Sequence, residues 1–225
     1  MWIKSLRAYV RTRRGEGVQS LTGKEKFRRC LVLFDSALDD IKRKGQIESW
    51  NEDEIQEQER YFTEGYLSIV RKSLFYDYVL ECIGQKERWK EYPYPFPTEA
   101  LPAEIRYKMN LRDKCILVDY RKTTSIAKQI AIIRRGEEVC GEKYTFYKGI
   151  GIGFARTGNH RVISAAMENY DLIADEVTVI DDDSFFEKYA TDGEYWYEKG
   201  DPQKIVGNVF DYRVALIFTI VQKTK

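Results

Sequence analysis

The first third of the chain carries an apolar pattern with a helical period. Between Lys24 and Lys44, six apolar side chains lie three or four residues apart and share one helical face: Phe27, Cys30, Leu31, Phe34, Leu38 and Ile41. Gly45 is a natural end for this helix, because glycine readily adopts the left-handed conformation that often follows a helix. This part of the chain is therefore predicted to bury its apolar residues as helix.

A second, longer helix is predicted over residues 52–83. It begins with the acidic run EDEIQEQE, which suits the positive end of a helix dipole. Its predicted core face holds Phe62, Tyr66, Ile69, Val70, Leu74 and Leu80. Before both helices the chain is basic, with Arg7, Arg11, Arg13 and Arg14. Two interpretations of this arm stay open: a loosely docked segment, or one that contacts nucleic acid.

The helical pattern ends at the proline segment YPYPFPTEALP. Alternating prolines exclude a regular helix, so a boundary is predicted here, with a helical region over 1–92, a connector over 93–112 and an α+β domain over 113–225. The later pattern predicts strands over 115–120, 144–155 and 176–180 and a closing strand in VFDYRVALIFTIV. It predicts two helices, one that begins at Thr123 or Thr124 and ends at Gly136, and one over 161–170. A hairpin is predicted at Asp192-Gly193. The predicted fold class is α+β, with a helical N-terminal part followed by a mixed sheet with helices.

Charge and cysteine content give little support to several classes of function. The chain has 37 Lys and Arg against 36 Asp and Glu, so its net charge offers no global argument for nucleic acid or an anionic membrane. Its four cysteines are far apart and form no CxxC pair, so a disulfide framework or a zinc site is not expected. No secretory signal and no apolar run of about 20 residues are recognisable. We therefore expect a cytoplasmic protein without a membrane partner.

The single histidine lies where the apolar, glycine-rich sequence GIGIGFA meets a helical segment, in Thr157-Gly158-Asn159-His160-Arg161. Thr157 or Asn159 suits the N-cap of that helix. Free backbone N–H groups at a helix start, with the positive dipole end behind them, form a ready anion site. The predicted phosphate-binding residues are Thr157, Gly158, Asn159 and Arg161, and the predicted catalytic residues are His160 and Arg161. Gly-Asn is also a common turn, so a purely structural turn remains an alternative.

Other polar groups are predicted as accessories. Arg121 would join the anion site if strand 115–120 neighbours the strand before the motif. Asp182 and Asp183 follow strand 176–180, where carboxylates could bind magnesium or favour the start of a helix. Glu168 is expected to form an exposed ion pair or no specific contact. Tyr195-Trp196-Tyr197 is expected to pack across strands or, alternatively, to stack on bases. No metal-binding residue is assigned.

The Gly-Asn-His-Arg junction, with the strand before it and EVTVI after it, resembles the ParB/sulfiredoxin-like superfamily over roughly residues 113–181. In that superfamily the motif contacts nucleotide phosphates, which implies phosphate contacts for Gly158, His160 and Arg161. Asn159 stands where sulfiredoxin has its reactive cysteine and ParB its glutamate, so the resemblance does not imply sulfiredoxin activity. The chain is also similar to an uncharacterised bacterial domain family that shares the Gly-Asn-His junction, an Asp-x-Ser segment at 182–184 and an Asp-Gly-x-x-Tyr hairpin at Asp192.

Two hypotheses for the function follow. In the first, an intracellular bacterial or phage-type protein binds a phosphate-bearing ligand at residues 157–161, either a nucleotide or a nucleic-acid backbone. Phosphoryl transfer or phosphodiester hydrolysis is the chemistry this site would support, and a nucleoside triphosphate with magnesium is among the compatible ligands. In the alternative, the chain is a non-enzymatic interaction or regulatory protein in which the motif is a structural turn. We favour the first hypothesis.

Overall fold

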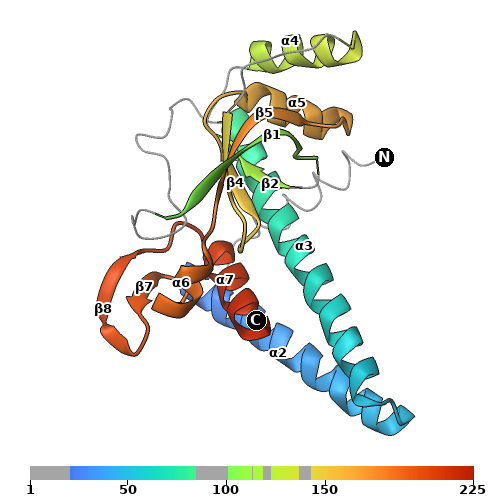
Figure 1. Cartoon of the computed structure of the whole chain (residues 1–225), viewed down its shortest axis with the longest axis vertical. Helices are drawn as coiled ribbons and strands as arrows, with labels where there is room; N and C mark the ends of the chain where they lie inside the picture. The colour runs from blue at the N-terminus through green and yellow to red at the C-terminus, as the bar shows by residue number, and fades with distance from the viewer. Residues whose placement is uncertain (1–20, 85–100, 113, 119–122, 137–142) are drawn as a thin grey trace.

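The computed structural model describes residues 21–84, 101–112, 114–118, 123–136 and 143–225 (Figure 1). Its helices are α2 (Gly23–Glu48), α3 (Glu52–Gly84), α4 (Thr123–Arg134), α5 (Asn159–Glu168), α6 (Asp183–Lys188) and α7 (Tyr212–Thr224). Its strands are β1 (Ala103–Asn110), β2 (Cys115–Leu117), β3 (Lys143–Tyr147), β4 (Ile152–Ala155), β5 (Ile173–Ile180), β6 (Tyr189–Thr191), β7 (Tyr195–Glu198) and β8 (Asp201–Asn208). The predicted α+β class, with a helical N-terminal part, is confirmed.

The larger sheet is mixed, with strand order β1-β5-β3-β4-β2. β2 runs parallel to β4, with Leu117 opposite Phe154, and β3 runs parallel to β5. The pairs β1–β5 and β3–β4 are antiparallel. The smaller sheet, β6-β7-β8, is antiparallel throughout. Because β2 and β4 are parallel neighbours, their carboxyl ends lie at the same edge of the sheet.

Both faces of the larger sheet are buried at β2, β3 and β4, as the continuous apolar run of β2 requires, whereas the edge strand β1 is exposed. Cys115 and Leu117 belong to one core with residues of α2, α3 and α7, whereas Ile116 and Val118 belong to another with residues of α4 and α5. Figure 1 shows α4 and α5 at one end of the molecule, and α2, α7 and the smaller sheet at the other, with the long α3 running between them. The first core joins the N-terminal helices to the C-terminal helix, so it spans the predicted boundary between regions.

Helix α2 continues past its predicted end at Gly45. Its start is fixed by a capping box in which Thr22 and Glu25 satisfy each other's backbone amides. Gly45 is buried instead of exposed at a C-cap, because the side chains of Ile55 and Trp50 pack where its β-carbon would be. The helix ends four residues later, at Ser49 in the left-handed conformation.

The predicted bounds of α3 are confirmed to within one residue, but Ile69 and Leu80, predicted as core, are 68% and 49% exposed.

Two predicted elements have a different structure. Residues 103–110 lie in the predicted connector but form β1 at the edge of the larger sheet. The predicted closing strand is the helix α7, whose N-cap residue Asp211 accepts a hydrogen bond from the backbone N of Arg213 at 2.8 Å. Residues 214–218 are all buried within the first core, so this stretch has no polar face to reveal its helical period.

The predicted hairpin at Asp192-Gly193 is confirmed, and it connects β6 to β7. Trp196 is 1% exposed, and its ring meets that of Phe218 edge-on at 4.9 Å between centroids. The central aromatic residue of this strand therefore packs against helix α7 in the core and not across strands, and it is not available to stack on bases. Among the described helices, none combines the length and apolar character needed to cross a bilayer.

Asp192 gives the fold an expected acid sensitivity. Burial raises the pKa of its carboxyl, but hydrogen bonds from Lys24 and from the amides of Tyr195 and Glu194 outweigh this effect and lower the pKa from 3.8 to about 2. A carboxyl with a lowered folded-state pKa contributes stability that is present above its unfolded-state pKa and lost as pH falls through the folded-state value. As the pH falls from 4 to 2, the free energy of unfolding of wild type should therefore decrease more than that of Asp192→Asn. The expected difference is about 1 kcal/mol, because solvent screens part of the interaction.

Urea unfolding at several pH values measures this difference. Asp39→Asn, at an exposed position on α2, serves as the control and should follow wild type. Parallel curves for wild type and Asp192→Asn from pH 4 to 2 would contradict the role given to Asp192.

Candidate functional site

The sequence GIGIG before the motif is a turn rather than part of one long strand. Residues 148–151 connect β3 to β4, and the amides of Gly149 and Ile150 donate to the carboxylate of Asp182. Asp182 is fully buried, and burial raises the pKa of its carboxyl despite these hydrogen bonds. Asp182 therefore holds this turn in place. Asp183 forms an ion pair with Lys225.

The predicted accessory carboxylates do not join the motif. The turn at 148–151 precedes β4, and residues 157–161 follow it, so the two groups lie at opposite ends of that strand. This separation was not predicted from the sequence, because residues 144–155 were expected to form a single strand without a turn. The remaining accessory, Arg121, lies outside the described residues.

The five motif residues lie together at the start of α5, but the predicted side-chain cap is absent. Gly158 is the N-cap residue, in the left-handed conformation at φ 75°, with no side-chain cap hydrogen bond. Thr157 instead binds the beginning of β3, where its hydroxyl accepts from Lys143 N at 2.7 Å and its amide donates to Lys143 O at 3.1 Å. A glycine suits this position because other L-residues are strained at such a φ. The prediction that Thr157 or Asn159 caps α5 is therefore wrong.

The first turn of α5 is partly closed by its own backbone. The amides of Arg161 and Val162 both donate to the carbonyl of Gly158, at 2.9 and 3.1 Å. Asn159 is 1% exposed, and His160 and Arg161 are half-buried, with Nε2 of His160 shielded from solvent. The motif is thus more enclosed than an open anion-binding loop would be.

Helices α4 and α5 start side by side and run in the same direction. Each follows one of two parallel neighbours in the sheet, α4 after β2 and α5 after β4. The hydroxyl of Ser164, in the middle of α5, donates to the carbonyl of Ile126, in the first turn of α4, at 3.1 Å. At their ends, the guanidinium of Arg134 donates twice to the carboxylate of Glu168, both at 2.8 Å. Of the two expectations for Glu168 the ion pair is therefore the one observed, although the Glu168 side chain is only 22% exposed. Two helix N-termini, each with a partial positive charge, therefore lie at one edge of the sheet.

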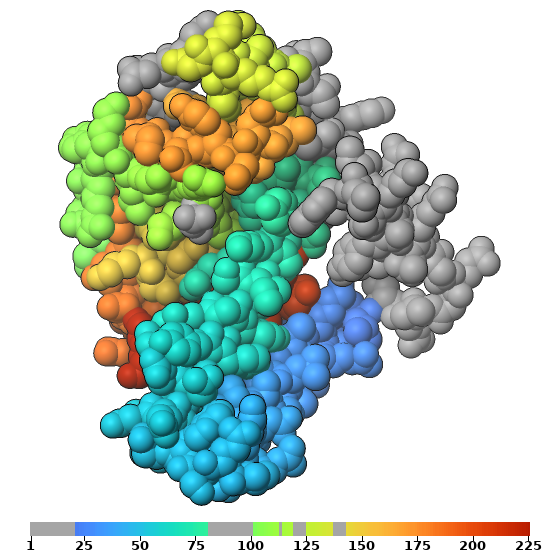
Figure 2. All heavy atoms as spheres, turned by 90° about the vertical axis from the view of Figure 1, so that its right-hand side faces the viewer, coloured from blue at the N-terminus to red at the C-terminus, as the bar shows by residue number. Residues whose placement is uncertain are grey.

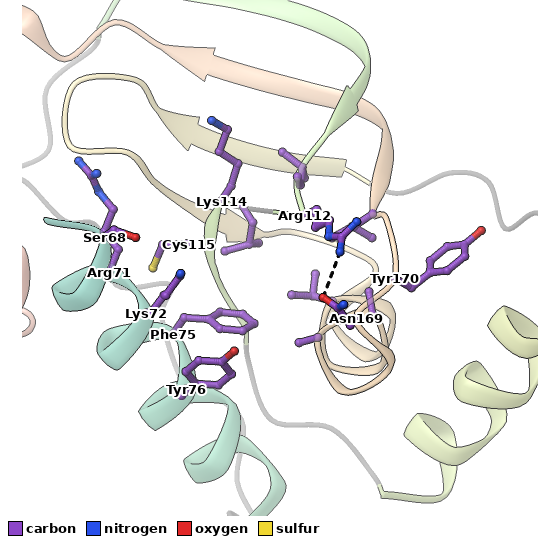
Figure 3. A pocket seen from close by; sticks show the side chains of 16 residues that line it. Ser68, Arg71, Lys72, Phe75, Tyr76, Arg112, Lys114, Cys115, Asn169 and Tyr170 are labelled. Carbon is purple, nitrogen blue, oxygen red and sulfur yellow. Dashed lines mark hydrogen bonds between the residues drawn. The ribbon is translucent and has the colours of Figure 1, made fainter. Parts of the chain in front are cut away.

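A cavity of about 290 Å³ lies along a different side of α5 (Figure 3). It is bounded by α3, by the segment from Leu111 to Ile116 that includes most of β2, and by α5. Four cationic side chains line it: Arg71, Lys72, Arg112 and Lys114. Sequence analysis missed this site, although Arg71-Lys72 followed by Phe75-Tyr76, one turn further along α3, was a readable signal.

Comparison with known proteins gives a family but no activity. A family model described as "Family of unknown function (DUF6710)" matches residues 18–225. The chain belongs to this family. No curated protein and no solved structure matches the chain. The prediction of an uncharacterised family is thus supported, while the comparisons contain no match to the ParB/sulfiredoxin-like superfamily.

The described part of this DUF6710 chain contains no group of three His, Cys, Asp or Glu side chains that could hold a metal ion. Burial raises the pKa of the Cys115 thiol to about 12, so this thiol is neutral near pH 7. Ser164 is fully buried, and its hydroxyl is committed to Ile126. Neither side chain is therefore suited to act as a nucleophile.

Proposed function

We propose that this protein binds a phosphate-bearing ligand, a nucleotide or a nucleic-acid backbone, where α4 and α5 begin. The supporting observation is the parallel arrangement of these two helices after the parallel strands β2 and β4. Ligands of open α/β sheets commonly bind beyond the carboxyl ends of parallel strands. Two aligned helix dipoles and the guanidinium of Arg161 together favour an anion at this edge.

Three of the motif residues have a defined role in this proposal. Gly158 supplies a backbone amide and the left-handed turn, Arg161 supplies charge, and Thr157 fixes the loop to β3. The resemblance to the ParB/sulfiredoxin-like superfamily supports the same assignment, since the corresponding motif contacts nucleotide phosphates there. Because Nε2 of His160 is shielded from solvent, binding is better supported than proton transfer by this residue.

The alternative, a non-enzymatic interaction protein, is favoured by a different feature. Helices α2 and α3 form a long hairpin whose tip extends away from the rest of the molecule (Figures 1 and 2). Large apolar side chains are exposed along it, namely Val32, Leu33, Ile47, Tyr61, Ile69, Tyr76 and Leu80. Exposed apolar surface of this kind is typical of protein interfaces.

Thermal unfolding with nucleoside triphosphates, magnesium and short oligonucleotides tests the proposed site. A ligand at about 100 times its dissociation constant stabilises the folded state by about 2.7 kcal/mol. For a chain of this size that corresponds to a rise in Tm of roughly 5–10 °C. Arg161→Gln should abolish most of this shift, whereas Lys128→Gln, on the exposed surface of α4, should keep it.

The proposal fails if no compound raises the Tm of wild type, or if Arg161→Gln retains the full shift. A nucleic-acid backbone as the ligand predicts binding that weakens steeply with salt, because phosphate contacts release counterions. A mononucleotide predicts a much weaker dependence.

A further inference from the structure

We propose a second, separate ligand site in the cavity between α3, β2 and α5, which takes a small phosphate monoester with a planar ring, such as a mononucleotide. In Figure 3, Lys72, Phe75 and Tyr76 project from α3 on one side, and Arg112 and Asn169 lie on the other. The volume of about 290 Å³ is at the lower end of the roughly 300–1,000 Å³ usual for small-molecule pockets. That size suits a mononucleotide better than a dinucleotide or a folded nucleic acid.

The charge of the lining selects an anion. It has four cationic side chains, and no carboxylate is present among the described residues that line the cavity. Arg71 and Lys72 form no ion pair with any residue the structure describes. Low-dielectric walls lined by one sign of charge concentrate the field and raise the local concentration of the opposite ion.

Arg71 lines one end of the cavity, and its guanidinium points away from the space between Lys72 and Arg112 (Figure 3). Its Nε donates to the carbonyl of Ile150 at 2.9 Å, which fixes the guanidinium beside the β3–β4 turn. Burial lowers the pKa of this guanidinium, and no carboxylate compensates it within the described chain. Arg71 therefore adds positive potential to the cavity from its edge, without contacting the phosphate itself.

Lys72 and Arg112 are the side chains placed to contact the phosphate. Lys72 is exposed, and its ammonium group is not engaged by any described carboxylate. Arg112 donates to Asp171 at 3.1 Å and to Asn169 at 3.3 Å, but these are exposed contacts of the kind that contribute little stability. A ligand phosphate can therefore compete for the guanidinium. Lys114 lies over the ring of Phe146, at 5.8 Å from its centroid, and adds positive potential.

The remaining lining provides a surface for a planar ring. Phe75 and Tyr76 are adjacent on α3, with ring centroids 5.4 Å apart and planes inclined at 61°. Buried apolar side chains, including Ile116 and Val162, complete the wall. Aromatic side chains bind bases of any sequence by stacking, because every base has a π-face. Phosphate and nucleoside would thus contact different parts of one cavity.

This site is independent of the one proposed at the start of α5. The residues of α5 that line the cavity are Val162, Ala165, Ala166 and Asn169, which lie on one helical face. Arg161 does not line it. Substitutions can therefore affect one site without the other.

Isothermal titration of the full chain with AMP, CMP, inorganic phosphate and adenosine tests the proposal. Wild type should bind both nucleotides, and inorganic phosphate and adenosine each at least about tenfold more weakly, because each offers only half of the contacts. Lys72→Gln and Arg112→Gln should each weaken nucleotide binding by about tenfold or more, the usual effect of losing a charge-assisted contact. Lys128→Gln should leave this binding unchanged. Arg161→Gln should remove only the binding at the start of α5, so in that variant the cavity should still bind AMP and CMP.

Three results would overturn the cavity site. The first is no binding of either nucleotide to wild type. The second is nucleotide binding that neither Lys72→Gln nor Arg112→Gln weakens. If Arg161→Gln removes that binding instead, the nucleotide binds at the start of α5. The third is inorganic phosphate binding as tightly as AMP, which would show that the aromatic wall makes no contribution.

Discussion

Arg213→Ala is expected to lower the free energy of unfolding by about 3–5 kcal/mol, the usual effect of removing one partner from a buried ion pair. The Arg213 side chain is 10% exposed, and its guanidinium binds Asp211 at 2.7 Å and Asp77 at 2.6 Å. These contacts tie the start of α7 to α3. Burial lowers the pKa of Arg213, but the hydrogen bonds and charges of Asp211 and Asp77 outweigh it and raise the pKa overall. Removing the guanidinium would leave the carboxylate of Asp211, 13% exposed, without its counter-charge. Urea unfolding measures the change.

The matched control is Arg60→Ala on the exposed surface of α3. Arg60 forms ion pairs with Glu57 and Glu64 at 3.8 and 3.5 Å, but all three side chains are at least half exposed. Exposed pairs contribute about 0–1 kcal/mol, so this variant should unfold close to wild type. If Arg213→Ala lowers the free energy of unfolding by less than about 1 kcal/mol, the ion pair does not behave as a buried one. Water would then solvate the carboxylate of Asp211 once the guanidinium is removed.

Sequence analysis succeeded where one face of an element is apolar and the other polar. The predicted bounds of α3 and the strand EVTVI are confirmed, because their patterns repeat with the period of a helix or a strand. The Asp192-Gly193 hairpin is confirmed because its turn chemistry is local. Each of these elements could be inferred from neighbouring residues alone.

The failures occur where distant residues decide the local structure. Residues 214–218 of α7 are buried on all sides, so a run of branched and aromatic residues resembled a strand. The turn at 148–151 is stabilised by Asp182, more than 30 residues later. The stop expected at Gly45 is overridden by the packing of Ile55 and Trp50. No local pattern contains these contacts.

The same division applies to the candidate sites. Residues 157–161 were found because they are contiguous and lie between a strand and a helix. The cavity was missed because Lys72 and Arg112 are 40 positions apart in the sequence and meet only when α3 lies beside the segment before β2. Charge balance also concealed it, since an overall charge of +1 says nothing about where the cations gather.

Gly193→Ala is expected to destabilise the fold by about 3 kcal/mol or more, because strain and overpacking act together. Gly193 has φ 90°, which an L-residue adopts only with strain. A β-carbon there would also lie 2.4 Å from Cβ and 2.5 Å from Cγ of Phe27, a core residue of α2. The hairpin and α2 would have to separate, which would expose part of the core that joins the two ends of the chain.

Gly200→Ala separates the two causes. Gly200 has φ 93°, almost the same as Gly193, but no atom lies within 4 Å of its added β-carbon. This variant should show the strain alone, about 1–2 kcal/mol. The difference between the two variants in urea unfolding therefore measures the contact of Gly193 with Phe27. Equal losses would mean that α2 moves away from the hairpin without cost, and that the N-terminal helix is not held by this contact.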